Sequence, residues 1–522
     1  MPLRPFRLAP AALAVLALAT LPAGAQPAPQ PGGVLRIAID TDPQCLDPQQ
    51  AGNNNSLNVG RQITDSLTDQ RPDTGALVPW LAASWSVSAD NLEFTFQLRD
   101  DASFSDGTPV DAAAVKANLE GIVKLGARAS LGAGYLAGLR EVRIPDSRTV
   151  TVAFAAPNIQ FLQATSTMSL GLLAPATLAR SAEERCQGQL VGSGPFTVAR
   201  FVHNQQVRLN RRDDYAWPSA LARHQGRAHL EGIEYRVIPE SGVRTGSLVS
   251  RQIDVNASVP PQDERLLLAQ QLPVLARANP GLVYSFFPNE ADPLLRDPLL
   301  RQAIVKAVNR AELQSIISRF QAPASAVLAK TTPLYSDLSA LLAHDPDGSR
   351  QLLEEAGWRP GQGGIRERDG QRLVIRLSYW QSTPFLELVQ QQLRAVGIDL
   401  QLNRTTISQV TALRDSGSYQ LQFFNLTRAD PDILRAVFGS SGRNVNNRAA
   451  APVDALLQAS SAELDPTRRR DLVAQAERAL IEAGHVIPLV ELSTVIATGK
   501  NVHGLDYEAS SRLQLYDTWL GR

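Results

Sequence analysis

The chain has 522 residues, of which 44% are hydrophobic and 20% are charged, a balance typical of a folded globular protein. Its 51 basic and 51 acidic residues give a net charge of zero, so the basic excess that nucleic-acid-binding proteins and proteins of anionic membranes usually carry is missing. No nucleic-acid partner is therefore expected. The length exceeds what a single hydrophobic core supports, so two or three domains are expected.

The first 25 residues have the composition of a secretory signal peptide. A short basic start is followed by an apolar run over 8–21 and by Ala23-Gly24-Ala25, which matches an A-x-A cleavage site. The alternative is a membrane anchor, but that needs about 20 apolar residues, and Pro10 and Pro22 shorten this run. No cysteine follows closely enough to carry a lipid. The expectation is a freely diffusing periplasmic protein, exported with cleavage of the signal peptide.

Residues 77–115 carry the clearest local pattern in the chain. Leu92, Phe94, Phe96 and Leu98 alternate with polar residues, which predicts a strand with one buried face. Asp111 stands where an N-cap would precede a helix over about 112–124. The segment is therefore expected to form a strand, a turn and a capped helix.

This segment also resembles the signature of the family 5 extracellular solute-binding proteins, the peptide- and nickel-binding receptors that serve ABC importers. The resemblance implies an α/β, two-lobed periplasmic binding protein-like fold of class II, in its large three-segment form, with a hinge and an interlobe cleft. The matching residues are Pro79, Leu81, Ala82, Trp85, Asp90, Phe94, Phe96, Leu98, Arg99, Phe104, Asp106, Gly107, Pro109 and Val115.

Further elements before residue 273 are predicted from alternation and turn residues. They are a strand over 34–40, a hairpin with strands 196–201 and 206–211, a strand over 233–238 and a helix over 241–250. Residues 252–255 resemble the strand that follows this helix in the family. Gly132-Ala-Gly134 has the wrong spacing for a dinucleotide fingerprint and is interpreted as a loop.

From about Pro273 the pattern changes to alternating helices and strands, which favours a parallel α/β layer and a second lobe. The predicted helices are 297–319, 349–356, 384–396 and 408–415, and the predicted strands are 373–379, 398–403 and 420–425. The strand over 486–492 and the C-terminal segment are expected, from the resemblance, to rejoin the first lobe.

The expected domain division follows from these elements and from the resemblance. Lobe 1 has a core domain made of residues 26–59, 189–272 and 488–522, and an inserted domain over 60–188. Lobe 2 spans 273–487. The chain would then cross between the lobes more than once.

Two cysteines, Cys45 and Cys186, remain after the signal peptide. In an oxidising compartment they can form a disulfide. Two separate buried thiols are the alternative, because spacing alone does not show whether the two Cα atoms approach each other.

The common catalytic and metal-binding motifs are absent from the sequence: there is no G-x-S-x-G elbow, H-E-x-x-H, Walker loop or C-x-x-C. The six histidines are scattered. Among them, His224 and His229 are close in sequence, and five residues apart on a helix they would not share a face. No cofactor and no resident metal are expected, and the protein is not expected to be an enzyme.

The resemblance directs attention to the loop after a late strand, where oligopeptide and dipeptide receptors place an acidic side chain against the ligand's ammonium group. Alignment on Asp430-Pro431-Asp432 leaves Thr427, Arg428 or Ala429 at that position. An arginine suits a carboxylate or phosphate, so the ligand is expected to carry an anionic group. The alternative is that Arg428 points to solvent or pairs with one of the two aspartates. Candidate ligand-binding residues here are Asn425, Arg428 and Asp430.

Other candidates come from strand ends and from the resemblance. Tyr379 and Trp380 end a strand of lobe 2, the edge where α/β sheets bind ligands, with packing as the alternative. Arg414 falls where an oligopeptide receptor places a ligand-facing arginine. The remaining candidates are Asp40, Thr41 and Asp42 after the first strand, and Ser493 after the strand over 486–492.

The function predicted from this resemblance is the substrate-binding component of an ABC import system. Its expected partners are a small solute, with short peptides or amino-acid-derived compounds first, and the permease subunits at the inner membrane. A monomer is expected. Nickel complexes, opines and oligosaccharides are alternative ligands. An enzyme on the same scaffold, or a sensory or chaperone-like binder, is an alternative of another class.

Overall fold

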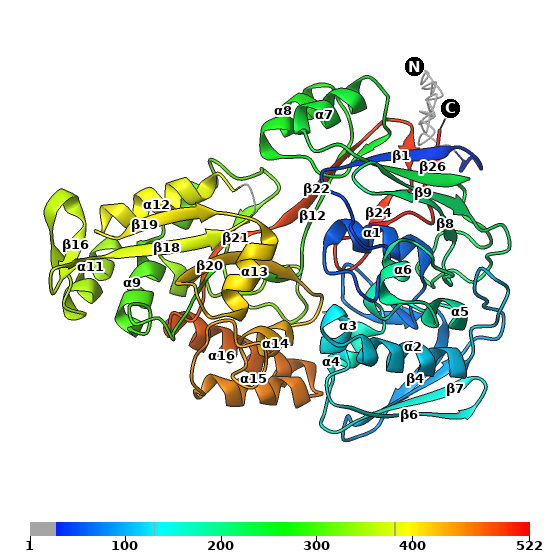
Figure 1. Cartoon of the computed structure of the whole chain (residues 1–522), viewed down its shortest axis with the longest axis horizontal. Helices are drawn as coiled ribbons and strands as arrows, with labels where there is room; N and C mark the ends of the chain where they lie inside the picture. Colours follow the sequence, from blue (N-terminus) through cyan, green and yellow to red (C-terminus); the bar gives the residue numbers. More distant parts are fainter. Residues whose placement is uncertain (1–27, 130, 381–382, 522) are drawn as a thin grey trace, which may run out of the picture.

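The computed structural model describes residues 28–129, 131–380 and 383–521, and these fold into two lobes that lie side by side (Figure 1). The predicted signal peptide lies outside the described residues. No helix in the described part of the chain is both long and apolar enough to cross a membrane.

The central sheet of lobe 1 is built around the first strand. β1 pairs in parallel with strands on both of its sides, and the C-terminal strand β22 joins the same sheet. The predicted hairpin is confirmed, with Asn204 in the left-handed conformation at its turn. The strand order is β12 (Val274–Ala278), β22 (Ser493–Thr498), β11 (Val255–Asn256), β1 (Val34–Ile39), β10 (Gly232–Val237), β9 (Gln206–Arg211) and β8 (Phe196–Val202).

The inserted part of lobe 1 confirms the pattern read from residues 77–115. Phe94, Phe96 and Leu98 lie buried on one face of β5 (Glu93–Leu98), and α2 (Ala112–Leu125) begins where the Asp111 side chain accepts a hydrogen bond from the Ala114 N–H (2.8 Å). The sheet has the order β4 (Ala82–Val87), β5, β7 (Thr149–Phe154) and β6 (Leu139–Asp146).

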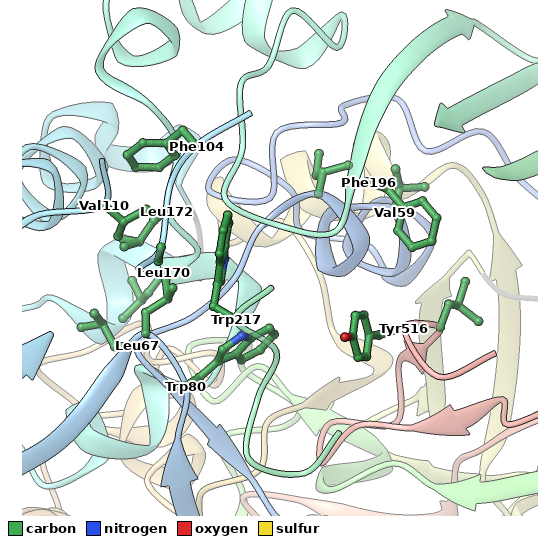
Figure 2. Packing of buried hydrophobic residues seen from close by; sticks show 14 of the residues in the cluster. Val59, Leu67, Trp80, Phe104, Val110, Leu170, Leu172, Phe196, Trp217 and Tyr516 are labelled. Carbon is green, nitrogen blue, oxygen red and sulfur yellow. The ribbon is translucent and has the colours of Figure 1, made fainter. Parts of the chain in front are cut away.

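A large hydrophobic core joins the central sheet of lobe 1 to its inserted part, and a smaller apolar cluster lies under α7 and α8. Figure 2 shows Trp80 and Trp217 close to one another, with Tyr516 of the C-terminal segment nearby. Tyr215 links these rings, with centroids 4.9 Å from Trp217 and 5.6 Å from Tyr516. The last segment of the chain is therefore held in lobe 1 by packing as well as by β22. The other helices of this lobe are α1 (Asn54–Ile63), α3 (Gly132–Tyr135), α4 (Gln160–Ala164), α5 (Pro175–Leu178), α6 (Ala182–Cys186), α7 (Ser241–Val249) and α8 (Pro261–Ala269).

Lobe 2 is built on a mixed six-stranded sheet with its own hydrophobic core. The strand order is β14 (Ala322–Pro323), β21 (Ile487–Glu491), β13 (Gly281–Pro288), β20 (Leu421–Thr427), β18 (Val374–Tyr379) and β19 (Asp399–Arg404). Its helices are α9 (Pro298–Ala307), α10 (Arg310–Leu313), α11 (Pro346–Glu355), α12 (Phe385–Ala395), α13 (Ile407–Asp415), α14 (Ile433–Phe438), α15 (Val453–Ala462) and α16 (Pro466–Glu482).

The predicted parallel layer is confirmed over β18, β19 and β20, and β13, a strand that the sequence pattern did not predict, pairs antiparallel with β20. Two other predictions about these elements are wrong. The helix expected over 297–319 breaks at Asn309, because the side-chain amide of Gln392 bonds both the N–H and the carbonyl of Asn309 (3.1 Å each) in place of helical partners. Gly132-Ala-Gly134 lies in the short helix α3 rather than in a loop.

The two lobe boundaries also differ from those expected. β12 pairs with β22 in the sheet of lobe 1, so the first crossing comes at Asn279 and Pro280 rather than at 273. β21 pairs with β13 in lobe 2, so the second crossing comes at Leu492. The positions of both crossings depend on which strands pair, and the local sequence pattern does not show that pairing.

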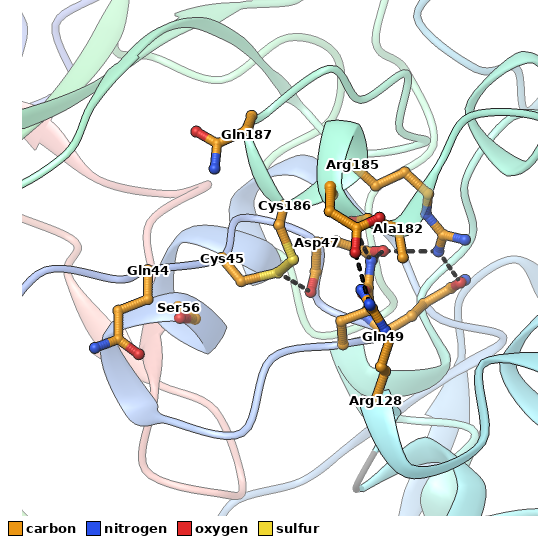
Figure 3. The surroundings of a disulfide bond; sticks show 12 residues. Gln44, Cys45, Asp47, Gln49, Ser56, Arg128, Ala182, Arg185, Cys186 and Gln187 are labelled. Atoms are coloured by element: carbon orange, nitrogen blue, oxygen red, sulfur yellow. Dashed lines mark hydrogen bonds and ion pairs between the residues drawn. A yellow bond between two sulfur atoms is a disulfide. The ribbon is translucent and has the colours of Figure 1, made fainter. Parts of the chain in front are cut away.

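The two cysteines form a disulfide that ties the loop after β1 to α6 (Figure 3). Buried polar contacts surround it. The Arg185 guanidinium lies 2.7 Å from the Asp47 carboxylate and donates to the Gln49 side chain (2.7 Å). Burial raises the pKa of Asp47, against the opposing effect of Arg185. The disulfide alternative is therefore the one that the fold adopts.

Replacing both cysteines by alanine is expected to lower the free energy of unfolding by about 2–4 kcal/mol, because the link closes a long loop of the unfolded chain. The two cysteines are 141 residues apart. Denaturant unfolding with and without reductant checks this. Reductant should bring the wild-type protein to the stability of the variant and leave the variant unchanged, whereas a wild-type protein insensitive to full reduction would contradict the prediction.

A pH dependence follows from Glu477, which is buried in lobe 2 and accepts a hydrogen bond from the Leu328 N–H (2.8 Å). Burial raises its pKa to about 8. The unfolded chain loses this proton near pH 4.5, so the free energy of unfolding falls as the pH rises from there to about 8. Glu477→Gln removes this loss, and its stability relative to wild type should rise by a few kcal/mol over that range. Urea unfolding of both proteins at about pH 4.5 and pH 8 tests this. The same stability difference between variant and wild type at the two pH values would contradict it.

Candidate functional site

The two crossings between the lobes are adjacent and are held together by Asn279. Its N–H donates to the Leu492 carbonyl (2.8 Å), and its side-chain oxygen accepts from the N–H (3.0 Å) and hydroxyl (2.8 Å) of Thr494. Its side-chain NH₂ donates to the Thr427 hydroxyl at the end of β20 (3.3 Å). The crossings therefore form one unit, placed where a hinge between the lobes is expected.

Two cavities of the described chain are lined by both lobes. The larger, of about 370 Å³, is called the interlobe cavity below. Lobe 1 contributes residues of α3 and α4 to it, and lobe 2 contributes the end of β20, α14 and the loop over 439–443. The second, of about 340 Å³, lies between the turn at 70–75 and the segment 330–333.

Arg428 reaches from lobe 2 into lobe 1. Its guanidinium lies over the Tyr135 ring, 4.5 Å from the centroid, and its Nη1 donates to the Gln160 side chain (3.2 Å). The residue is 6% exposed, and its Nε has no hydrogen-bond partner among the described residues. Neither alternative from the sequence occurs, since Arg428 is buried and both nearby aspartates pair with other arginines.

The aspartates of the same loop are fully engaged within lobe 2. Asp430 accepts two hydrogen bonds from Arg469 (3.2 and 2.8 Å). Asp432 accepts two from Arg435 (2.8 and 2.7 Å). Each aspartate is therefore neutralised by an arginine of lobe 2 without any ligand.

A further arginine of the interlobe cavity, Arg443, lies exposed on the loop after α14. Its pKa is lowered to about 10, because surrounding protein removes part of its hydration and because Arg414 adds a like charge. Arg414 itself contacts Asp415 (3.4 Å). The cavity therefore has an excess of positive charge on its lobe 2 side.

The candidates after β1 lie in lobe 1 and are bonded to neighbouring segments. Asp40 and Thr41 both accept hydrogen bonds from the Asn55 side chain (3.1 and 2.8 Å). The Asp42 carboxylate accepts from the Gln44 N–H (2.6 Å) and lies 3.2 Å from the His203 ring. These residues do not line the interlobe cavity.

The remaining candidates lie at strand ends of lobe 2 or at the crossing. Tyr379 and Trp380 pack partly buried against the core of lobe 2, and Asn425 is half-buried in β20. The Ser493 hydroxyl donates to the Phe320 carbonyl (2.6 Å). Of the ten candidates from the sequence, Arg428 lines the interlobe cavity; the ligand-binding roles of all ten stay predictions.

Sequence reasoning missed the residues of lobe 1 that meet Arg428, and it missed Arg443. Gln160 and Tyr135 carry no motif that could have identified them. Arg443 follows Gly439-Ser-Ser-Gly442, a small-residue loop directly after a helix, and loops of this kind often carry binding residues. That signal was available.

Two α/β lobes that meet over a shared cavity beside a double crossing define a protein built to enclose a small solute. The chain matches the family model described as "Bacterial extracellular solute-binding proteins, family 5 Middle" over residues 76–446. The chain therefore belongs to the family 5 extracellular solute-binding proteins, and the resemblance read from the sequence is confirmed. Members of this family are the solute-binding components of ABC importers.

Similar proteins agree with this assignment. The chain is 27% identical over 425 residues to the oligopeptide-binding protein OppA of Mycobacterium tuberculosis, covering 77% of this chain and 70% of OppA. It is 25% identical over 491 residues to the probable D,D-dipeptide-binding periplasmic protein DdpA of Escherichia coli, covering 91% of each. The crystal structure of NikA from Brucella suis in complex with Fe(III)-EDTA superimposes with a TM-score of 0.80 and 23% identity, covering 94% of this chain and all of NikA, which confirms the predicted fold.

Asn279→Ala should remove the two side-chain hydrogen bonds to Thr494 that join the crossings and the one to Thr427 of β20, and it should lower the free energy of unfolding by about 1–3 kcal/mol. Denaturant unfolding measures this loss. Asn279→Asp keeps the oxygen that accepts from Thr494, so its free energy of unfolding should fall by less than that of Asn279→Ala. A fully stable Asn279→Ala protein would show that the crossings are held by the strands alone.

Proposed function

We propose that this protein captures a short peptide, or a peptide-like or amino-acid-derived solute, between its lobes and delivers it to the permease of an ABC importer. The observation that carries the proposal is the interlobe cavity, which both lobes line beside their double crossing. Relatives named for oligopeptide and D,D-dipeptide binding support the solute class. The protein works in the periplasm as a monomer.

The proposed mechanism is closure around the solute. A solute that touches both lobes gains contacts that exist only when the lobes are together, so it shifts the population toward the closed state by its differential affinity. The permease then recognises the closed form. No covalent step is needed, and the solute is released unchanged.

The sequence-derived candidates take places in this proposal. Asp40, Thr41 and Asp42 of lobe 1 and Tyr379 and Trp380 of lobe 2 lie outside the interlobe cavity, and they border the parts of the solute that extend beyond it. Arg414, Asn425, Arg428, Asp430 and Ser493 complete the set. Because Asp42, Asp430 and Ser493 already bond within the protein, they act by shaping the walls.

Export completes the proposal. The signal peptide is removed after Ala25, so the mature protein begins at Gln26. Determining the N-terminal sequence of protein taken from the periplasm tests this directly.

Protein purified from its own periplasm should carry a small molecule. Native mass spectrometry, compared with the denatured mass, should show a difference that matches a released solute. Adding that solute to stripped protein at a hundred times its Kd should stabilise the fold by about 2.7 kcal/mol and reduce the radius of gyration in solution scattering. The solute should be recovered unaltered after long incubation. A chemically altered solute would favour the enzyme alternative, and binding without compaction would contradict closure.

A further inference from the structure

Arg428 is bonded differently from the other buried arginines of lobe 2. Arg310 donates to four backbone carbonyls, of Pro488, Val305, Val308 and Leu342, over 2.7–3.2 Å. Arg469 donates to both carboxylate oxygens of Asp430 and to the Ser460 carbonyl. Arg428 has one side-chain hydrogen bond within the described chain, to the neutral Gln160, and its Nε has none.

Burying a guanidinium against an aromatic ring and one amide leaves its charge unmatched. A cation over a ring gains some attraction, but a buried charge normally has a carboxylate or several hydrogen-bond acceptors. The two carboxylates nearest in sequence are held by Arg469 and Arg435. Arg428 therefore retains donors and charge for another partner.

Three arginines of the described chain line this cavity, and Arg435 among them is paired with Asp432, whereas Arg443 adds a second cation beside Arg428. No residue in the described ranges accepts a hydrogen bond from its guanidinium, and Arg414 and Arg428 are the like charges that act on it. Asp415 opposes their effect only in part, and an anion bound near Arg428 and Arg443 would relieve the repulsion between these like charges. Arginine forks match the planar oxygens of carboxylates and the oxygens of phosphates.

The lining suits a small anionic group. Leu131, Ile433 and Val437 provide apolar wall, and Gly134 leaves space beside the guanidinium, since a Cβ there would lie 3.8 Å from Arg428 Nη2. Because α3 and α4 belong to lobe 1 while both arginines belong to lobe 2, a group bound here contacts both lobes.

We propose that the interlobe cavity is a subsite for a carboxylate or phosphate group of the captured solute, held by Arg428 and Arg443 of lobe 2 and by Gln160 of lobe 1. The inference rests on the proposed function and narrows it to solutes with an anionic group. The oxygens of that group accept hydrogen bonds from the two arginines of lobe 2 and from the side-chain NH₂ of Gln160 in lobe 1, so a single group is held by both lobes.

The test uses calorimetric titration with three probes that differ in charge at nearly constant size. Gly-Glu, Gly-Gln and Gly-Gln amide carry net charges of −1, 0 and +1, and inorganic phosphate is a separate arm. The affinity of the wild-type protein should fall from Gly-Glu to Gly-Gln to Gly-Gln amide, and the Kd values of the first and the last should differ at least tenfold. Binding of inorganic phosphate together with no binding of the anionic peptide would assign the group as a phosphate.

The variants locate the effect in the cavity. Arg443→Gln and Arg428→Gln should each weaken binding of the anionic probe tenfold or more and flatten the charge series, and Arg443→Lys should restore part of it. Gly134→Leu, which changes no charge, should exclude the group by size. Arg468→Gln is the matched control, because its side chain is 71% exposed on lobe 2 and pairs with Glu463; it should behave as wild type.

The outcomes separate the two proposals. Equal binding of all three peptides by the wild-type protein, or an unchanged charge series in Arg443→Gln and Gly134→Leu, would overturn the anionic subsite and leave the receptor function standing. Failure of the wild-type protein to bind any probe, together with an empty protein from the periplasm, would overturn both.

Discussion

The double crossing between the lobes is the constraint on which the rest of the architecture depends. The chain passes from β12 of lobe 1 to β13 of lobe 2 and returns from β21 of lobe 2 to β22 of lobe 1, and Asn279 bonds one crossing to the other. Phe320 of lobe 2 packs into a small apolar cluster of lobe 1 at the same place. The lobes are thus fixed to one another at one edge, and a solute can change their separation at the other.

Most buried arginines of lobe 2 are bonded to carboxylates or to several carbonyls and serve the fold, whereas Arg428 keeps donors that a ligand can use. Asp430 with Arg469 and Asp432 with Arg435 form paired contacts that hold the loop after β20 in place. That loop in turn presents Arg428 to lobe 1. Since its neighbours bind the local carboxylates, Arg428 is held by Gln160 and the Tyr135 ring and has no carboxylate of the described chain bonded to its guanidinium, which is the arrangement expected of an anion contact.

Local signals in the sequence predicted much of lobe 1. The alternation in β5, the Asp111 cap of α2 and the Asn204 turn each depend on residues a few positions apart, so their physics is visible in a short window. The break at Asn309 is different, because its cause is Gln392, more than eighty residues away. No window around the helix could contain it.

By itself, the sequence determined the family, the strands and helices with clear periodicity, and the presence of Arg428 in the loop before Asp430. Only the tertiary structure decided that Cys45 pairs with Cys186, that the lobes change at Asn279 and Leu492, and that Gln160 and Arg443 meet Arg428 at one cavity. The reason is physical: periodicity and capping act between near neighbours, whereas pairing, crossing and charge matching depend on residues brought together by the packing of the whole chain.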